Sequence, residues 1–476
     1  MLALRVHAPC FRAANVLRPI ARALALALCV AVLSFSPALL AQSVQTGERV
    51  VYVAPPPLGS EDGDGSSVTP LQSVQAGIER AFEQRSTQVI VALGEYNESL
   101  VLRDGVSISG GFLTSTGGWV RAADGMRSVL RGTTPIVAAS IFEPTVLSGL
   151  HLIANDATTP GESVYGVFVV SCSGLHLRDV YIDAGRGAAG STGAAGEAAP
   201  AASLGEAATV EQGGAGATSS CGARGGDGGA GGRSGEMGLA GAIGRNGGVS
   251  GVGGRSGSCV SPDRCTPGEN GTPGGAIWHG SPGRDGISGS GGGFYSGWFR
   301  TSPGMLGGSG QPGAGGGGGG GGGARDSTGG GGGGGGAGGC GGAGGGGGGG
   351  GGASLGLVAI DSTVLLSDVM IETDQGGAGG VGGVGGAGGA GGFGGMGSPS
   401  PTDGHGGEGG RGGDGASGGF GGCGGGGAGG PSIGLYEVRA FVRDHATTII
   451  IDASGAGGES CGNQGRRGHA IERVSE

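Results

Sequence analysis

Four carboxylates occupy repeating positions in two segments of the sequence and could do chemistry together. Asp179 and Asp183 lie four residues apart, and Asp368 and Glu372 repeat that spacing further along the chain. Clustered carboxylates, sometimes with a calcium ion, are what enzymes that cleave polysaccharides use. A third copy of the segment has alanine and isoleucine at the two positions, so the acidic ladder stops there. Acids of this kind more often end strands, and we expect no catalytic residue among them.

A second group of residues is suited to binding rather than to catalysis. The stretch from Ala276 to Arg300 carries aromatic side chains in a region that is otherwise poor in side chains. Exposed aromatic rings form binding patches for sugars or for a receptor. The alternative is that they pack the glycine-rich region onto the rest of the protein, because aromatic rings are usually buried. The candidate patch consists of Trp278, Phe294, Tyr295, Trp298 and Phe299.

The cysteines offer one candidate disulfide and no metal site. Cys259 and Cys265 are close in sequence and could close a small loop. No Cys-x-x-Cys pair occurs and the seven histidines are scattered, so zinc is not expected. We expect no cofactor. Some glycine-rich chains bind calcium through a nonapeptide repeat, and this sequence lacks that repeat. An odd number of cysteines follows residue 41, so one thiol should be free, buried or intermolecular.

Residues 1–41 have the organisation of an export signal. Arginines precede an apolar run from Ala23 to Phe35, which is shorter than the roughly 20 residues of a membrane-spanning helix. Cleavage after Ala41 would remove four arginines from a chain of net charge −10 and leave −14. We therefore expect a secreted or cell-surface protein with no transmembrane segment after cleavage. So acidic a chain does not suit nucleic-acid binding.

Residues 42–184 have the composition of an ordinary folded region. The pattern near residues 70–85 predicts an amphipathic capping helix with Val74, Ile78 and Phe82 on one face. Short runs of Val, Ile and Leu, broken by Gly, Asp, Asn or Pro, then predict a series of strands. No helix is expected between these strands, which argues against βαβ units.

Two later segments repeat the end of this region. Residues 354–375 and 432–453 superpose at a constant offset of 78, so that Ile371 corresponds to Ile449. The end of the first region matches residues 354–375 at an offset of 190, which becomes 189 by Asp179. Units of about 20 residues cannot bury a core alone and become stable by stacking on their neighbours. The sequence therefore predicts an all-β solenoid, of which a parallel β-helix is the simplest form.

Long glycine-rich insertions interrupt the repeat at one corner. They occupy residues 185–353 and 376–431, and a C-terminal tail, 454–476, follows the last copy. The pattern Gly-Gly-X repeats without interruption over residues 376–397. A helix with three residues per turn would place every X on one edge and leave two bare edges where backbones could hydrogen-bond. An antiparallel pair with a turn at residues 398–404 fits the second insertion. A flexible linker is the alternative, above all for the uninterrupted glycine runs.

The first region also resembles a known family. VVYVAPPPLGSEDGDG, PLQSVQAGIERA and GEYNESLVLRDGVSISGGF resemble the opening of bacterial secreted proteins with the pectin-lyase-like right-handed parallel β-helix. The insertions resemble the glycine-rich regions of PE-PGRS-type surface proteins, the tips of some phage tail-fibre adhesins, and a glycine-rich antifreeze protein in which polyglycine II-like helices pack side by side. The resemblance implies a fold but little about activity.

From these features we expect a non-catalytic, secreted or cell-surface protein of structural or adhesion type. Its partners would be glycans or a cell-surface receptor. The alternative is a carbohydrate-active β-helix enzyme, similar to a polysaccharide lyase or hydrolase.

Overall fold

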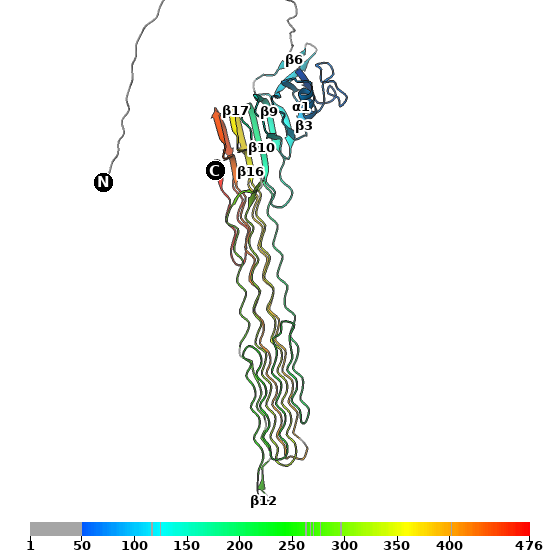
Figure 1. Cartoon of the computed structure of the whole chain (residues 1–476), viewed down its shortest axis with the longest axis vertical. Helices are drawn as coiled ribbons and strands as arrows, with labels where there is room; N and C mark the ends of the chain where they lie inside the picture. Colours follow the sequence, from blue (N-terminus) through cyan, green and yellow to red (C-terminus); the bar gives the residue numbers. More distant parts are fainter. Residues whose placement is uncertain are drawn as a thin grey trace, which may run out of the picture. The chain divides into compact units, whose positions relative to one another are not determined.

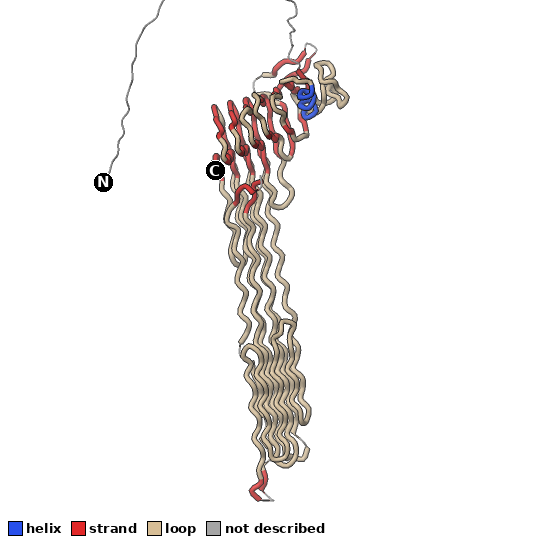
Figure 2. Tube along the Cα trace, viewed as in Figure 1, coloured by secondary structure: helices blue, strands red, loops and turns tan. Residues whose placement is uncertain are grey.

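The computed structural model describes residues 50–476, except 116–117, 124, 262–263, 267, 270, 277, 296–297 and 401. The expected export signal lies outside the described residues. Within them the protein is nearly all-β, with one helix, α1 (Val74–Glu83), and two large, mainly parallel sheets. The all-β class predicted from the sequence is confirmed. Figures 1 and 2 show the sheets at one end of the unit Glu48–Glu476 and long glycine-rich segments that extend from them.

The first sheet lies along the path β1 (Val50–Val53), β2 (Gln88–Ala92), β5 (Ser107–Ser115), β9 (Thr145–Ala154), β11 (Leu175–Ala184), β17 (Thr363–Thr373) and β19 (Phe441–His445). Beside this path lie β3 (Glu95–Tyr96), β6 (Gly118–Arg121), β7 (Ser128–Gly132) and β20 (Thr448–Ile451). The second sheet has the order β21 (Ala470–Ser475), β18 (Ser432–Val438), β16 (Ser354–Ile360), β10 (Val164–Val170), β8 (Ile136–Ala139) and β4 (Leu100–Val101). From β8 onward the chain alternates between the two sheets, except for two hairpins in the first insertion and for β19 and β20, which both lie in the first sheet.

The strand register reproduces the sequence repeat. Ser354 pairs with Ser432, and Ile371 pairs with Ile449, so the offset of 78 is confirmed in both sheets. Between β10 and β16 the offset is 190, whereas between β11 and β17 it is 189. The extra residue therefore lies in the turn between β10 and β11. Residues at equivalent positions of the sequence repeat are therefore register partners on neighbouring strands.

The inner faces of the two sheets share one hydrophobic core. Val167 and Leu357 come from the second sheet, and Val180 and Ile371 from the first, and all four are buried. Alternate residues of each strand point into this core because successive side chains of a strand point to opposite faces. The exclusion of water from these side chains is the main force that holds the sheets together.

Helix α1 packs on β1 and β2 at the start of the sheets. The Ser73 hydroxyl caps its first turn by accepting from the Ala76 N–H. Val74 and Ile78 are buried, as the sequence predicts. The prediction for Phe82 is wrong: its side chain is 51% exposed and lies beneath the Arg103 guanidinium. The buried stripe continues through Ala81 instead, one residue earlier around the helix.

The glycine-rich insertions form extended legs that run side by side (Figure 2). The N–H groups of Gly380 and Gly383 donate to the carbonyl oxygens of Gly349 and Gly346, at 2.7 and 2.8 Å. One residue number rises as the other falls, so these two legs are antiparallel, and the bonds recur at every third residue. The bonds therefore follow the three-residue period of the sequence.

The second insertion is the antiparallel pair that the sequence predicts. Gly412 donates to the Gly395 carbonyl oxygen at 2.9 Å, and Gly415 donates to that of Gly392 at 2.8 Å. The two legs are thus joined through the turn near residues 398–404. Residues 454–476, expected as a C-terminal tail, form a further leg and then strand β21, which pairs with β18.

The uninterrupted glycine runs form the centre of the bundle. A Cβ atom on Gly315, Gly316 or Gly317 would lie 2.0, 2.0 or 1.8 Å from the carbonyl oxygen of Arg224, Gly413 or Val249, respectively. Three successive residues therefore face three different legs, and no side chain fits on any of them. The flexible-linker alternative is wrong for this segment, since its residues are buried and hydrogen-bonded on all sides.

Candidate functional site

The acidic ladder begins at a sharp bend that recurs at four aligned positions of the first sheet. Asp179 and Asp368 have φ angles of 53° and 54°, and the residues aligned with them, Gly149 and Ala446, have 64° and 53°. Asp and Gly are among the residues that tolerate this left-handed conformation best. The two aspartates therefore recur in the sequence because the backbone bends there.

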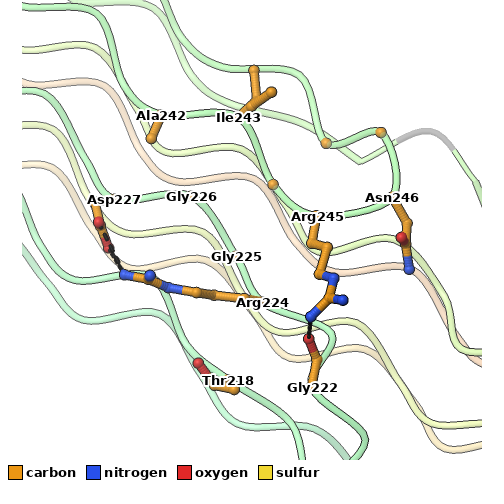
Figure 3. Close-up of a pocket in the computed structure, with 13 residues that line it drawn as sticks. Thr218, Gly222, Arg224, Gly225, Gly226, Asp227, Ala242, Ile243, Arg245 and Asn246 are labelled. Carbon is orange, nitrogen blue, oxygen red and sulfur yellow. Dashed lines mark hydrogen bonds and ion pairs between the residues drawn. The ribbon is translucent and has the colours of Figure 1, made fainter.

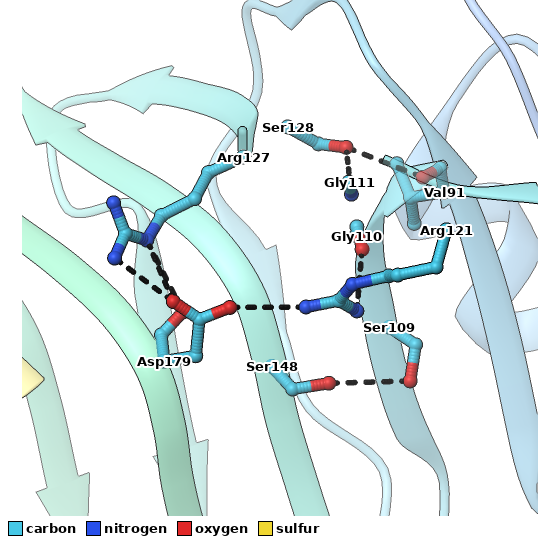
Figure 4. A network of polar contacts seen from close by, with 9 residues as sticks. All are labelled: Val91, Ser109, Gly110, Gly111, Arg121, Arg127, Ser128, Ser148 and Asp179. Atoms are coloured by element: carbon cyan, nitrogen blue, oxygen red, sulfur yellow. Dashed lines mark hydrogen bonds and ion pairs between the residues drawn. The ribbon is translucent and has the colours of Figure 1, made fainter. Parts of the chain in front are cut away.

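Asp179 is also held by two arginines, as Figure 4 shows. The Arg121 guanidinium lies 3.0 Å from one carboxylate oxygen, and that of Arg127 lies 2.8 Å from the other. Arg121 is itself fixed by donating to the Gly110 carbonyl oxygen at 2.8 Å. Asp179 thus ties β6 and the start of β7 to the bend before the second half of β11. Both oxygens of the Asp179 carboxylate are therefore in contact with arginines.

The other half of the ladder, Asp183 and Glu372, lies on the outer face of the first sheet. The two residues are register partners on adjacent strands. Burial and the neighbouring carboxylates of Glu372 and Asp374 raise the pKa of Asp183. The Tyr181 hydroxyl donates to Glu372, and this bond together with burial raises the pKa of Tyr181 to about 12. A hollow of about 290 Å³ beside them is lined by Asp183, Glu372, Thr373, Asp374, Ile450, Ile451 and Asp452.

Among the residues whose side chains the structure describes, cysteines form two disulfides between segments that are far apart in sequence. Cys221 pairs with Cys340, and Cys423 pairs with Cys461. Cys172 is free and buried between the sheets. Cys259 and Cys265 face each other as backbone partners in β12 (Cys259–Ser261) and β13 (Arg264–Cys265). Among the described residues, no group of three or more His, Cys, Asp or Glu side chains is placed to hold a metal ion.

Four residues of the candidate aromatic patch lie on one hairpin, β14 (Gly292–Tyr295) and β15 (Trp298–Thr301). Phe299 is only 5% exposed and packs in a second hydrophobic cluster on β10, β16 and β18. Phe294 meets the ring of Tyr436 on β18, with centroids 4.8 Å apart. Phe294 and Phe299 therefore pack the hairpin onto the second sheet, which is the packing alternative for the aromatic patch. The binding alternative is left for the rings that remain exposed.

The same hairpin holds two aromatic rings in solvent. Trp298 is 55% exposed and lies nearly parallel to the ring of Phe168, with centroids 5.8 Å apart. Tyr295 is 62% exposed. The Tyr165 hydroxyl accepts from the Phe299 N–H at 2.8 Å, which fixes the strand that carries Trp298. Burial raises the pKa of Tyr165, so this hydroxyl keeps its proton.

A groove of about 600 Å³ lies beside Trp298. One wall is the hairpin, and the other is the loop before β10 together with the residues after β7. The groove contains hydroxyl groups, one acid and one base beside the indole ring. We call this groove, lined by Thr133, Thr134, Thr159, Pro160, Gly161, Glu162, Ser163, Tyr165, Trp298, Phe299, Arg300, Thr301 and Gly350, the hairpin groove.

The structure does not bring Trp278 to this hairpin. Its indole lies against Gly247 in the glycine bundle, where an added Cβ would come within 2.5 Å of its Cδ1 atom. Sequence reasoning grouped the five aromatics because they are close along the chain. It missed Tyr165 and Thr133, which reach the hairpin groove only through folding.

None of the described helices is long and apolar enough to cross a membrane. Comparison with family models, curated proteins and solved structures finds no match to this chain.

Proposed function

We propose that this protein is a non-catalytic, secreted or cell-surface protein of adhesion type that binds saccharides in the hairpin groove. In this proposal the two sheets are a right-handed parallel β-helix of the pectin-lyase-like type, and the glycine-rich legs are polyglycine II-like helices. The alternation of strands between two parallel sheets supports the first assignment. The three-residue period of the interleg hydrogen bonds supports the second.

The observation that carries the proposal is the position of Trp298 over the groove. An exposed indole offers a flat apolar face on which a sugar ring can stack, while its rim stays in contact with water. The Thr133 and Thr134 hydroxyls and the charged groups of Glu162 and Arg300 supply hydrogen-bond partners for sugar hydroxyls. The volume of about 600 Å³ lies within the usual range of small-ligand sites.

The groove is also rigid before a ligand arrives. Thr301 Oγ1 donates to the Gly351 carbonyl oxygen at 2.5 Å, and Ser163 Oγ donates to that of Phe299 at 3.3 Å. On the opposite wall, Glu162 accepts from the Thr159 N–H at 3.2 Å. Rigid walls reduce the entropy lost on binding.

The test is binding of residues 42–476 to an immobilised panel of neutral oligosaccharides. We expect binding that falls at least tenfold in Trp298→Ala, because the stacking face is lost. Phe393→Ala is the matched control, since Phe393 is an exposed ring, 65% accessible, on a distant leg. Absence of binding, or equal binding by Trp298→Ala, would contradict the proposal.

A polysaccharide-cleaving enzyme is the second candidate, favoured by the adjacent carboxylates of Asp183 and Glu372. One acid with a raised pKa beside a second carboxylate is the arrangement of many glycosidases. Release of reducing ends from a polysaccharide by the wild type, abolished in Asp183→Asn, would decide for this candidate.

A further inference from the structure

A hollow of about 750 Å³ lies on the glycine bundle, between residues 218–227 and 242–248 (Figure 3). Six of the thirteen residues that line it are glycine, so the other side chains stand out from stretches of bare backbone. Two arginines, Arg224 and Arg245, reach into it, together with Asn246, Asp227 and Ile243. We call this hollow the arginine hollow.

Arg245 is held by a tight turn. Gly244 and Gly248 form an antiparallel bridge, and Asn246 and Gly247 between them have φ angles of 66° and 112°. Asn-Gly is the pair that such turns favour. The Arg245 N–H donates to the Arg224 carbonyl oxygen at 2.8 Å, so the two arginines are neighbours on adjacent legs.

The two guanidinium groups have different partners. Arg224 turns toward Asp227 and meets both carboxylate oxygens, at 2.9 and 3.0 Å. Arg245 donates one N–H to the Gly222 carbonyl oxygen at 3.1 Å. It makes no ion pair with any residue that the structure describes. The hollow therefore holds one positive charge without an acidic partner, on a chain of net charge −10.

The carbonyl contact orients Arg245 without using up its donors. A guanidinium has five N–H donors in a planar fork, and a carboxylate fits two of them side by side. The bond to Gly222 occupies one donor. The geometry leaves a free pair of donors and the neighbouring amide of Asn246 for an acidic group and an adjacent hydroxyl.

An apolar rim accompanies this charge. The indole of Trp278 lies directly on Gly247 and is 64% exposed. Ile243, which lines the hollow, is 75% exposed. Trp278 is not among the residues that line the hollow, but it lies against Gly247, which is. A positive fork and an amide, with an aromatic ring next to them, are the groups that recognise a sugar ring with a carboxylate.

We propose that the arginine hollow binds a terminal acidic sugar, whose carboxylate pairs with Arg245 and whose ring packs against Trp278. This inference rests on the proposed saccharide-binding function and adds a second site of different chemistry. It also gives Trp278 a role that the hairpin groove does not.

The test compares 3′-sialyllactose with lactose, which differ by one acidic sugar, in calorimetric titrations of residues 42–476. We expect 3′-sialyllactose to bind at least tenfold more tightly, and this preference to disappear in Arg245→Gln. Arg284→Gln is the control, because Arg284 is also exposed but lies on another leg outside the hollow. Equal binding of the two sugars by the wild type, or an unchanged preference in Arg245→Gln, would overturn the inference.

A third variant separates this inference from the proposed function. Trp298→Ala should retain the preference for 3′-sialyllactose, since the hairpin groove is a different site. If Trp298→Ala abolishes that preference, the acidic sugar binds in the hairpin groove, and the inference fails while the proposed function stands. If neither the oligosaccharide panel nor these two sugars bind, both fail.

Discussion

In the sheets, side chains fill the space between two layers of backbone, whereas in the glycine bundle the backbones themselves fill it. Val180 and Ile371 are buried between the sheets. Gly316 is buried equally well, yet an added Cβ would lie 2.0 Å from the Gly413 carbonyl oxygen. The sheets depend on the removal of apolar surface from water. The bundle depends on hydrogen bonds, which must offset the backbone entropy that glycine loses on folding.

The comparison explains why glycine content varies along the insertions. Residues 315–323 and 329–336 are buried and surrounded by backbone, and every residue in these two runs is glycine. The Gly-Gly-X leg has one edge in solvent, where Val381 and Val384 are 43% and 58% exposed. The leg of residues 187–208 has two exposed positions in most triplets and carries alanine, serine, threonine and glutamate there. The number of glycines per triplet thus follows the number of neighbouring legs.

The largest effect should come from a charge in the side-chain core. Ile371→Asp places an unpaired carboxylate between the sheets and should cost more than about 4 kcal/mol of unfolding free energy. Ile371→Val, which removes one methylene, should cost about 1 kcal/mol. Thermal melting followed by circular dichroism checks both. Unchanged melting of Ile371→Asp would mean that the sheets do not share a core.

The second largest effect should come from one methyl group in the backbone core. Gly316→Ala forces two legs apart and should cost about 3 kcal/mol, because hydrogen bonds between several legs weaken together. Gly275→Ala is the matched control, since a Cβ there meets no atom within 4 Å.

Amide hydrogen exchange over residues 313–340 is the direct measurement for this pair. The wild type and Gly275→Ala should be protected there, and Gly316→Ala should not. Exchange at the free-peptide rate in the wild type would show that the central glycines form a tether.

A third region, strands β18 and β21, has a partly buried ion pair at the edge of the hydrophobic core. The Glu437 side chain is 4% exposed and points inward, where it accepts from Arg473 Nε at 2.8 Å, from Ser475 Oγ at 2.8 Å and from the Val442 N–H at 2.7 Å. Inward charges of this kind discourage further strands from adding to an edge. Burial acts to raise the pKa of Glu437, but these bonds outweigh it and lower the pKa.

Arg473→Ala should therefore destabilise the protein by about 2 kcal/mol at neutral pH, less than a fully buried pair because Arg473 is 37% exposed. A lowered pKa in the folded state contributes stability above the ordinary value of 4.5. That contribution is lost as the pH falls through the lowered value. Glu437→Gln should remove this part of the acid dependence of unfolding. Identical acid unfolding of Glu437→Gln and wild type would contradict the assignment.

How much the sequence could predict also differs between the two regions. The register of the sheets follows from the offsets of 78, 189 and 190, because apolar residues such as Ile371 and Ile449 must align to share a core. The three-residue period of the legs was equally visible. Beyond the antiparallel pair of the second insertion, which legs touch was not visible, because glycine has no side chain that distinguishes one neighbour from another. The pairing of Cys221 with Cys340, across 119 residues, is one consequence.

The candidate sites were predictable only in part, for a related reason. The hairpin aromatics are adjacent in sequence, and the exposed ring of Trp298 was among them. The opposite wall of its groove comes from Thr133 and from residues 159–163, which have no common motif. Arg245 could not be identified as a candidate binding residue from the sequence. An arginine after glycine in a glycine-rich segment predicts only an exposed side chain.

The smallest effect should come from the X positions of the Gly-Gly-X leg, and it separates the two kinds of core most sharply. In the sheets, truncation of a buried valine or isoleucine leaves a cavity and costs free energy. Val381 is an apolar residue of the same kind, but its side chain points away from the neighbouring legs, so Val381→Ala should change the unfolding free energy by less than about 0.5 kcal/mol.

The adjacent Gly382→Val should open the leg, because its Cβ would lie 2.1 Å from the Gly424 carbonyl oxygen. In most proteins, replacing a large apolar side chain lowers stability more than replacing a glycine does. We expect the opposite order for this pair of variants. Amide exchange over residues 376–430 should therefore match the wild type in Val381→Ala and rise in Gly382→Val. Equal exchange in the two variants would mean that this leg is not held by its glycine edges.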